Sequence, residues 1–347
     1  MKESILSLTY DKLKEVLVSL NQPKYRAEQI YYELHNGKKL SEISNIPKDL
    51  KESLLETYED NVLEIVKVQV SSDGTQKFLY KLADGNLIEG VLMNYNFGYT
   101  LCVSSQVGCR MGCKFCASGI GGLVRNLTAG EMLATVALVN KINGGTIKNR
   151  AVTNVVLMGS GEPFDNYDNT IKFLKLISSD NGLNVSLRNI SLSTCGLVPQ
   201  IYKFSEEGLP VNLTISLHQP FNEKRKELMP IANAYSINEI LKACEFYFDK
   251  TGRRYIFEYS LVKGENDTKE CANELIKILK GKPCHVNVIR LNEVKESGLK
   301  STTEKEAYAF VGLLEKGGLS ATVRRLNGAD IDGACGQLRR NYIDLKK

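Results

Sequence analysis

Hydrophobic positions in the first 60 residues recur at helical spacing. Leu13, Leu17 and Leu20 follow one another at intervals of three or four residues, and a second such run ends near Gly37. This spacing places apolar side chains on one face of a helix, and a glycine after such a run is a common stop signal. The pattern predicts a small helical domain over residues 1–61.

From residue 62 the hydrophobic pattern changes to short strand-like runs. These runs read VLEIVKVQV, TQKFLYKL and NLIEGVLM, and they are separated by Asp73-Gly74 and Asp84-Gly85. Asp-Gly pairs suit hairpin turns, because glycine readily adopts the left-handed backbone that those turns need. We expect two consecutive hairpins, which form an extension over residues 62–98.

Residues 99–347 repeat a strand-like run followed by a longer helix-like run six times. The expected helices span 129–143, 167–179, 198–206, 236–249, 268–280 and 304–316. Such a repeat predicts an α/β fold with a parallel sheet covered by helices, as a doubly wound sheet or as a full or partial barrel. Reactive groups are then expected at the carboxyl ends of the strands.

Composition narrows the class of protein. With 43% hydrophobic and 24% charged residues the chain fits neither the disordered nor the fibrous class. Charged residues interrupt every apolar run well before the roughly 18 residues of a membrane span, and the N-terminus lacks a signal-peptide core, so a cytoplasmic protein without a membrane partner is expected. The net charge of +5 is compatible with a polyanionic partner but does not by itself indicate one.

Three of the nine cysteines, Cys109, Cys113 and Cys116, lie within eight residues of one another. Disulfides are disfavoured in a reducing cytoplasm, so metal binding is the first hypothesis. Iron–sulfur clusters are held by cysteine thiolates, and three ligands would leave one iron of a four-iron cluster open for chemistry. A structural zinc site is the alternative. It requires a fourth nearby Cys or His, and none of the three histidines lies near this loop.

The wider context of the three cysteines resembles a known family. LCVSSQVGCRMGCKFCASG, followed by GLVRNLTAGE, is similar to radical S-adenosylmethionine (SAM) enzymes of the RlmN type, the dual-specificity RNA (adenine-C2) methyltransferases, and to their Cfr-type relatives. The resemblance runs from YRAEQIY near residue 25 to DIDGACGQLRR near the end. It implies a partial (β/α)6 barrel over residues 99–347, a [4Fe–4S] cluster on the three cysteines and two SAM molecules per turnover.

Polar residues at successive strand ends complete the cofactor site that the resemblance implies. Gly161 and Glu162 follow the second strand in MGSGEP, where a G-x-G turn alone is weak evidence and gains weight from the neighbouring cysteine loop. By resemblance, SAM is bound by these two residues and by Ser193, Ser216, Leu217, His218 and Asn292. Taken singly, each of the latter is an ordinary strand-end residue, and His218 a structural histidine.

Three further residues receive a role only from the resemblance. Cys335 in DIDGACGQL matches the methyl-carrying cysteine, Cys102 the second catalytic thiol and Glu89 the proton acceptor. Without the family, they are an inert near-terminal thiol, a buried core thiol and a solvated strand residue. In the implied ping-pong mechanism one SAM methylates Cys335, and a second yields a radical that activates that methyl group for addition to adenine. Attack by Cys102 on the sulfur of Cys335 then releases the product and leaves a disulfide.

The implied substrates are an adenosine in the peptidyl-transferase region of 23S rRNA and the adenosine next to the anticodon of tRNA. The alternative is Cfr-type methylation at C8 of the same rRNA adenine, which confers antibiotic resistance. A base that reaches a buried centre must be unstacked, so we expect a positive rim around the site. The candidate rim residues are Arg110, Lys114, Arg125, Arg324, Arg325, Arg339 and Arg340, with Lys24, Tyr25 and Arg26 farther out.

The resemblance also implies an electron donor such as flavodoxin or ferredoxin, and we expect a monomer. Two hypotheses from other classes are a radical SAM enzyme for small molecules and a zinc-stabilised RNA-binding module. Neither needs the thiols of Cys102 and Cys335, so these two cysteines separate the methyltransferase hypothesis from both.

Overall fold

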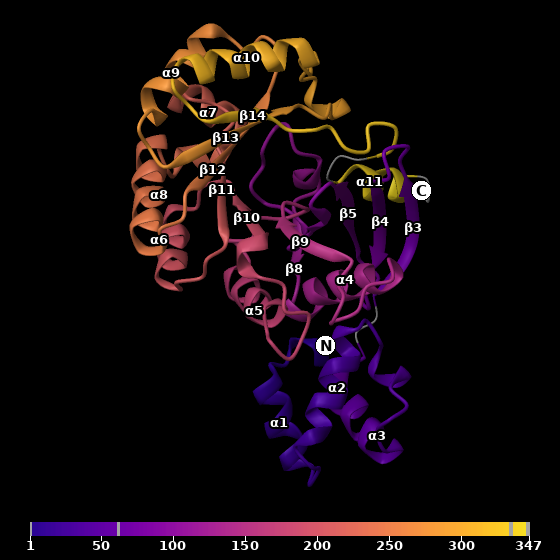
Figure 1. The fold of residues 1–347 in the computed structure, drawn as a ribbon. Coiled ribbons are helices and arrows are strands. Elements are labelled where there is room, and N and C mark those ends of the chain that lie inside the picture. The colour runs from indigo at the N-terminus through magenta and orange to yellow at the C-terminus, as the bar shows by residue number, and fades with distance from the viewer. Residues whose placement is uncertain (1, 61–62, 333–335, 345–347) are drawn as a thin grey trace.

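The computed structural model describes residues 2–60, 63–332 and 336–344. At the N-terminus, α1 (Tyr10–Ser19), α2 (Tyr25–His35) and α3 (Lys48–Thr57) form the expected small helical domain, which lies below the rest of the molecule in Figure 1. Short strands β1 (Glu3–Ser4) and β2 (Tyr58–Glu59) pair in parallel beside these helices. Leu13 and Leu17 are buried in this domain, as their spacing predicts.

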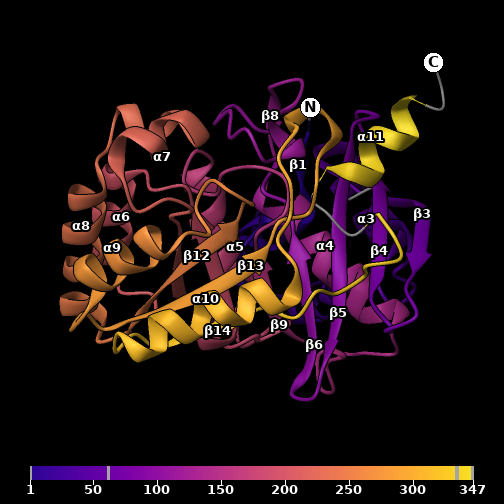
Figure 2. The same ribbon diagram turned by 90° about the horizontal axis from the view of Figure 1, so that it is seen from above.

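Ten strands form one sheet, and seven neighbouring strands of it are parallel. These are β6 (Gly98–Val103), β9 (Val152–Leu157), β10 (Ile190–Thr194), β11 (Asn212–Ser216), β12 (Tyr255–Leu261), β13 (Cys284–Arg290) and β14 (Ala321–Val323). Each pairs with the next in chain order, so the sheet is singly wound and curves with its helices on the outside (Figure 2). The fold is therefore a partial barrel and not a doubly wound sheet.

Six outer helices match the expected ones closely. They are α4 (Ala129–Ile142), α5 (Tyr167–Ile177), α6 (Val198–Glu206), α8 (Ile237–Thr251), α9 (Lys269–Leu279) and α10 (Glu304–Lys316). Three of them begin with a capping box, in which the cap side chain and the residue three positions later satisfy each other's backbone N–H groups. Two helices were not expected, α7 (Asn222–Leu228) and α11 (Gln337–Asp344). In the described part of the chain, no helix is both long and apolar enough to cross a membrane.

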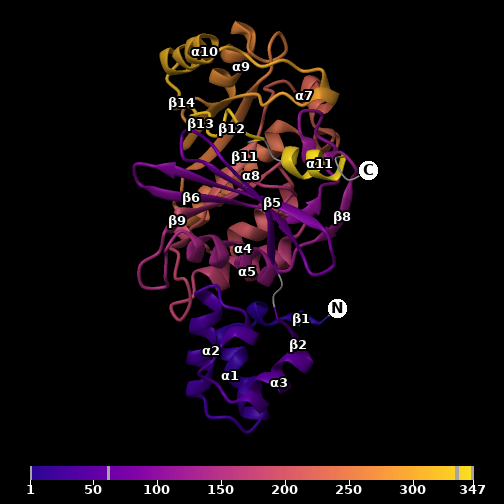
Figure 3. The same cartoon turned by 90° about the vertical axis from the view of Figure 1, so that its right-hand side faces the viewer.

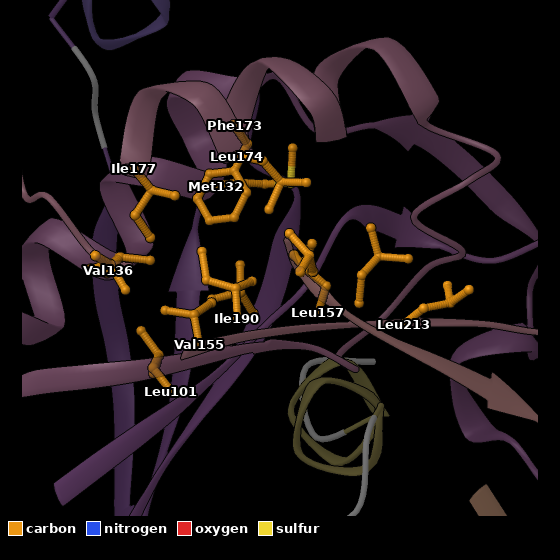
Figure 4. Close-up of a cluster of buried hydrophobic side chains, with 14 of the residues drawn as sticks. Leu101, Met132, Val136, Val155, Leu157, Phe173, Leu174, Ile177, Ile190 and Leu213 are labelled. Atoms are coloured by element: carbon orange, nitrogen blue, oxygen red, sulfur yellow. The ribbon is translucent and has the colours of Figure 1, made fainter. Parts of the chain in front are cut away.

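The core lies between the sheet and these helices. Figure 4 shows Leu101, Val155 and Ile190, from three adjacent strands, facing side chains of α4 and α5 such as Met132 and Phe173. All of these side chains are fully buried. A continuous apolar layer of this kind fixes the strand ends relative to one another, and the candidate site lies at those ends.

The expected hairpins are confirmed. Strands β3 (Glu64–Val70), β4 (Gln76–Lys81) and β5 (Leu87–Tyr95) are antiparallel, and β5 pairs with β6, so the extension continues the barrel sheet. Gly74 and Gly85 in the two turns both have φ of 82°. Helix α11 lies against β5 (Figure 3). The division of the chain into domains at residues 61 and 98 stays a prediction.

Close contacts join the helical domain to the barrel. The backbone N–H of Gly130 in α4 donates to Ser7 Oγ at 3.0 Å, and a Cβ on Gly130 would lie 2.6 Å from that oxygen. The ring of His35 accepts a hydrogen bond from the N–H of Leu183 at 3.2 Å. Burial lowers the pKa of His35 to about 3, so the ring is neutral at this junction.

Candidate active site

A cavity of about 370 Å³ lies at the carboxyl ends of the parallel strands. Most of the predicted site residues line it, namely Cys102, Cys109, Cys113, Cys116, Gly161, Glu162, Ser193, Ser216, His218 and Asn292. Glu89 and Leu217 are not among the described lining residues, and Cys335 lies outside the described part of the chain. Residues that are far apart in the sequence thus meet at the edge of the sheet where reactive groups were expected.

The cysteine loop is held at its base by a small hairpin. Strand β7 (Gln106–Gly108) pairs with β8 (Leu123–Asn126), and the N–H of Cys109 donates to the carbonyl of Gly122 at 3.0 Å. Gly108 has φ of 79°, and a Cβ there would lie 2.1 Å from that carbonyl oxygen. Only glycine fits this position, so the tight start of the loop depends on it. Farther along, the N–H of Lys114 donates to the carbonyl of Leu228 in α7 at 3.0 Å.

The three thiols share one electrostatic environment. Burial raises the pKa of Cys109 to about 11, an effect that the backbone N–H of Met111 opposes and the nearby Cys116 reinforces. Burial likewise raises the pKa of Cys113, and both other cysteines add to the shift. Without a bound cation Cys109 and Cys113 are therefore protonated at neutral pH, and a metal centre would have to bind with release of their protons.

The donor set fits a [4Fe–4S] cluster better than a single ion. Among the described residues, no three His, Cys, Asp or Glu side chains converge closely enough to hold one metal ion. A four-iron cluster takes each thiolate on a different iron, so its ligands stand farther apart than those of zinc. Three soft sulfur ligands line one cavity, which suits an iron–sulfur cluster.

The turn after β9 packs backbone to backbone against the end of β6. The N–H of Gly159 donates to the carbonyl of Val103 at 3.1 Å, and the N–H of Ser105 donates to the carbonyl of Ser160 at 2.9 Å. A Cβ on Gly161 would lie 2.6 Å from both Ser105 Oγ and Gln106 Cβ. The G-x-G pattern is therefore a requirement of this close approach.

Glu162 joins the ends of two strands. Its buried carboxylate accepts hydrogen bonds from the N–H groups of Phe164 at 3.0 Å and Cys195 at 2.8 Å. Burial raises the pKa of Glu162, and these hydrogen bonds oppose that shift. The carboxylate also lines the cavity, where it can accept a hydrogen bond from a ligand's ammonium group.

The ends of β10 and β11 contribute the polar wall. Ser193 Oγ and Ser216 Oγ are 3.5 Å apart. His218 has φ of 54°, and its Nδ1 accepts from the N–H of Ser260 at 2.9 Å, which places the ring proton on Nε2. Burial, reinforced by the nearby Arg225 cation, lowers the pKa of His218 to about 3, so the ring is a neutral donor.

Leu217 takes a different position from its neighbours. Its side chain belongs to the hydrophobic core, and its N–H donates to the carbonyl of Glu258 at 3.1 Å. A direct role of this residue toward a cofactor is therefore limited to its backbone.

Cys102 and Glu89 lie on adjacent strands of the site. Cys102 is buried on β6 and packs with Val91 and Met93 of β5. Glu89 is only 3% exposed, so its interpretation as a solvated strand residue is wrong. Its carboxylate is 2.9 Å from Lys77 Nζ and accepts the N–H of Gly336 at 2.6 Å. Glu89 thus contacts the immediate chain neighbour of Cys335.

The sequence analysis missed the buried Arg225 and misplaced Arg324. Arg225 on α7 donates to the carbonyls of Cys195 at 2.8 Å and Ser216 at 3.1 Å, which ties the ends of β10 and β11 together. Its helix, NEKRKEL, reads as a solvated segment, so the sequence offered no signal. Arg324 was expected on a rim, and it forms an ion pair with Glu258 inside the cavity at 3.2 Å. A glutamate inside the apolar run YIFEYSLV was the available signal.

Two arginines expected on the positive rim, Arg110 and Arg125, both pair with carboxylates, and they differ in their exposure. Arg125 lies between Asp84 at 2.6 Å and Glu131 at 2.7 Å, and its side chain is 20% exposed. Its assignment to the rim is wrong, because two carboxylates already engage it. Arg110 pairs with Asp165 but keeps 62% of its side chain exposed.

Comparison with known proteins extends over the whole chain. Residues 103–276 match the family described as the Radical SAM superfamily. A protein of Lachnospira eligens named probable dual-specificity RNA methyltransferase RlmN is 50% identical over 343 residues, which cover 98% of this chain and 97% of that protein. A Clostridium perfringens protein of the same name is 50% identical over 347 residues and 99% of each chain. The crystal structure of a radical SAM methyltransferase from Sphaerobacter thermophilus matches with a TM-score of 0.91 and 39% identity, over 96% of this chain and 98% of that one.

Proposed function

Because the chain belongs to the radical SAM superfamily and, within it, to the RlmN family, we propose that it methylates C2 of adenine in RNA. The proposed substrates are the adenosine of the 23S rRNA peptidyl-transferase region and the adenosine next to the anticodon of tRNA. The observation that carries the proposal is the cavity in which the three-cysteine loop, the G-x-G-E turn and Cys102 meet. A cofactor-cleaving enzyme for small molecules would not need the last of these.

The superfamily uses a [4Fe–4S] cluster and SAM. In this chain Cys109, Cys113 and Cys116 would hold the cluster, and the SAM site would comprise Gly161, Glu162, Ser193, Ser216, the Leu217 backbone, His218 and Asn292. When bound, these groups supply a methyl group, an electron and a carbon radical that abstracts hydrogen. The apolar wall formed by Val91, Met93 and Met158 excludes water from this part of the cavity.

The chemistry of adenine explains why two protein thiols are proposed. C2 of the ring is electrophilic, so it does not attack the electrophilic methyl group of SAM directly. We assign to Cys335 the role of carrying the methyl carbon, with two SAM molecules consumed per turnover. Cys102 then attacks the sulfur of Cys335, which forms an S–S bond as the S–C bond to the base breaks, and the released carbon takes the proton given up by the Cys102 thiol. Glu89 is the proposed acceptor of the proton lost from C2, and a donor such as flavodoxin or ferredoxin reduces the disulfide and the cluster.

Mass mapping of modified adenines tests this function. A strain that lacks the gene should lose 2-methyladenosine from both 23S rRNA and tRNA, and the wild-type gene should restore it. Complementation with Cys335→Ala is the matched control and should not restore it. Loss of 8-methyladenosine in place of 2-methyladenosine would contradict the C2 assignment and support Cfr-type chemistry.

A further inference from the structure

The pair formed by Lys77 and Glu89 is unusually well buried for two charged residues. Nζ of Lys77 on β4 is 2.9 Å from Oε2 of Glu89 on β5, and the side chains are 1% and 4% exposed. Lysine is almost never fully buried unless it is paired. The desolvation cost of a buried ion pair is large, so a pair of apolar residues would stabilise the sheet as well or better. Stability of the sheet alone therefore does not explain why a charged pair is buried here.

The glutamate also binds the start of α11. Its Oε2 accepts the N–H of Gly336, and its Oε1 accepts the N–H of Arg339, both at 2.6 Å. N–H groups in the first turn of a helix have no partner within the helix, and a negative charge there is favourable. The carboxylate of Glu89 thus caps α11, while Lys77 pairs with the same oxygen that accepts the N–H of Gly336.

The segment that follows the cysteine loop also restricts the backbone of Gly336. A Cβ at this position would lie 2.9 Å from the backbone N of Ser118, two residues after Cys116, and φ is 81°. The backbone of Gly336 is thus held between the Glu89 carboxylate and the segment that follows the cysteine loop. The residue before it in the sequence is Cys335.

The other flank of the segment is held by contacts nearer the surface. Asp330 accepts the N–H of Ser72 at 3.0 Å, and Gln69 donates to Asp332 at 3.0 Å. Both contacts are made by the β3–β4 hairpin. The chain is therefore anchored on both sides of Cys335, and the anchor at Glu89 is the buried one.

We propose that Lys77 is a positioning residue, which keeps the Glu89 carboxylate in place as the cap of Gly336 and Arg339 and thereby holds the start of α11, directly after Cys335 in the sequence. The proposal rests on the proposed function, because that function gives Cys335 a methyl group to deliver. Without Lys77 the buried carboxylate loses its counter-ion, and the cap of α11 weakens. Cys335 then transfers its methyl carbon to adenine fewer times per SAM molecule cleaved.

The test compares Lys77→Met with the matched control Lys81→Met in the full-length holoenzyme. Met keeps the length of the side chain and removes the charge, and Lys81 is an exposed lysine at the end of the same strand. One measurement is amide hydrogen exchange of residues 336–342, which needs no turnover. The other is the number of 5′-deoxyadenosine molecules released per adenine methylated.

We expect Lys77→Met to lose exchange protection at the start of α11 and to raise the ratio of cofactor cleaved to base methylated. A displacement of about 1 Å can cost roughly 100-fold in a positioned reaction, so a rise of that order is expected. Lys77→Arg should recover part of the coupling, and Lys81→Met should resemble the wild type.

Unchanged exchange in Lys77→Met would overturn the proposal, and so would a parallel fall of cleavage and methylation at constant ratio. If Lys77→Met does not fold, Lys77→Gln, which also removes the charge but leaves the Glu89 carboxylate in place, replaces it, and exchange of α11 decides the case in the same way. A wild type that cleaves SAM without methylating adenine would refute the proposed function instead, and the exchange measurement would still decide whether Lys77 anchors α11.

Discussion

Alanine at Gly161 should destabilise the protein through backbone strain and through a close contact of the new Cβ. Two other glycines, Gly121 and Gly159, each show one of these effects alone. Gly161 has φ of 111°, and a Cβ there would lie 2.7 Å from the backbone N of Gln106. Gly121 has φ of 94° with open space around it, so alanine at Gly121 carries the backbone effect alone. Gly159 has no positive φ, but a Cβ there would lie 2.8 Å from the backbone N of Ser104, so alanine at Gly159 carries the contact effect alone.

The magnitudes follow from these three environments. A left-handed backbone costs an L-residue about 1–2 kcal/mol, and overpacking against a rigid neighbour costs about 1–3 kcal/mol. Gly121→Ala should therefore lose about 1–2 kcal/mol of unfolding free energy, Gly159→Ala about 1–3 kcal/mol and Gly161→Ala about 2–5 kcal/mol. The last figure is a large part of the roughly 5–15 kcal/mol that stabilises a typical domain.

Urea denaturation of the three variants, followed by far-UV circular dichroism, measures the differences. The expected order of midpoints is wild type, then Gly121→Ala, with Gly161→Ala lowest. If Gly161→Ala and Gly121→Ala unfold at the same urea concentration, the close approach of the two strand ends is not a constraint on this turn, and the physical account of the G-x-G pattern fails.

Three further predictions concern charge, hydrogen bonding and the proposed chemistry. The pKa of His35 is about 3 in the folded protein against 6.5 for the free side chain, so the unfolded state binds more protons between these values. Stability should therefore be complete above about pH 6.5 and fall as the pH drops below it, and a wild type whose melting temperature declines no faster than that of His35→Phe between pH 7 and pH 5 would contradict this. Glu162→Gln turns one acceptor oxygen into a donor opposite a backbone N–H and should cost about 1–3 kcal/mol in urea denaturation, so an unchanged midpoint would show that the two N–H groups find other partners. Cys335→Ala removes the thiol that carries the methyl carbon, so base methylation should be abolished, and retained methylation in a mass spectrum of the RNA would remove the proposed carrier.

The elements that sequence patterns predicted well are those fixed by local chemistry. The helix expected over 304–316 is Glu304–Lys316, because Thr303 and Glu306 mark its start within four residues of sequence. The site residues at strand ends were assigned by the family resemblance, and their grouping in space follows from the fold. A singly wound parallel sheet brings all its carboxyl ends to one edge, so order along the chain is enough to group them.

The buried ion pair and the Arg225 contacts were not predictable in this way. In TQKFLYKL, Lys77 shares one face of its strand with Leu79 and Lys81, a pattern that fits a solvated face as well as a buried one. Its burial results from the register between β4 and β5 and from α11 lying against β5, more than 240 positions later. Spacing within one segment carries no information about such a distant partner.

The contacts that hold the C-terminal segment are among the most distant in the sequence. Ser72 and Asp330 are 258 positions apart, so their contact closes a loop that contains the whole barrel. Loop closure over such a span is entropically costly, and distant contacts form slowly. Pulsed hydrogen exchange during refolding should therefore show α11 gaining protection after α4 and β9, and simultaneous protection would contradict this order. A barrel that has already formed is then not yet an active enzyme, because activity also requires the C-terminal segment to dock on the hairpin of β3 and β4.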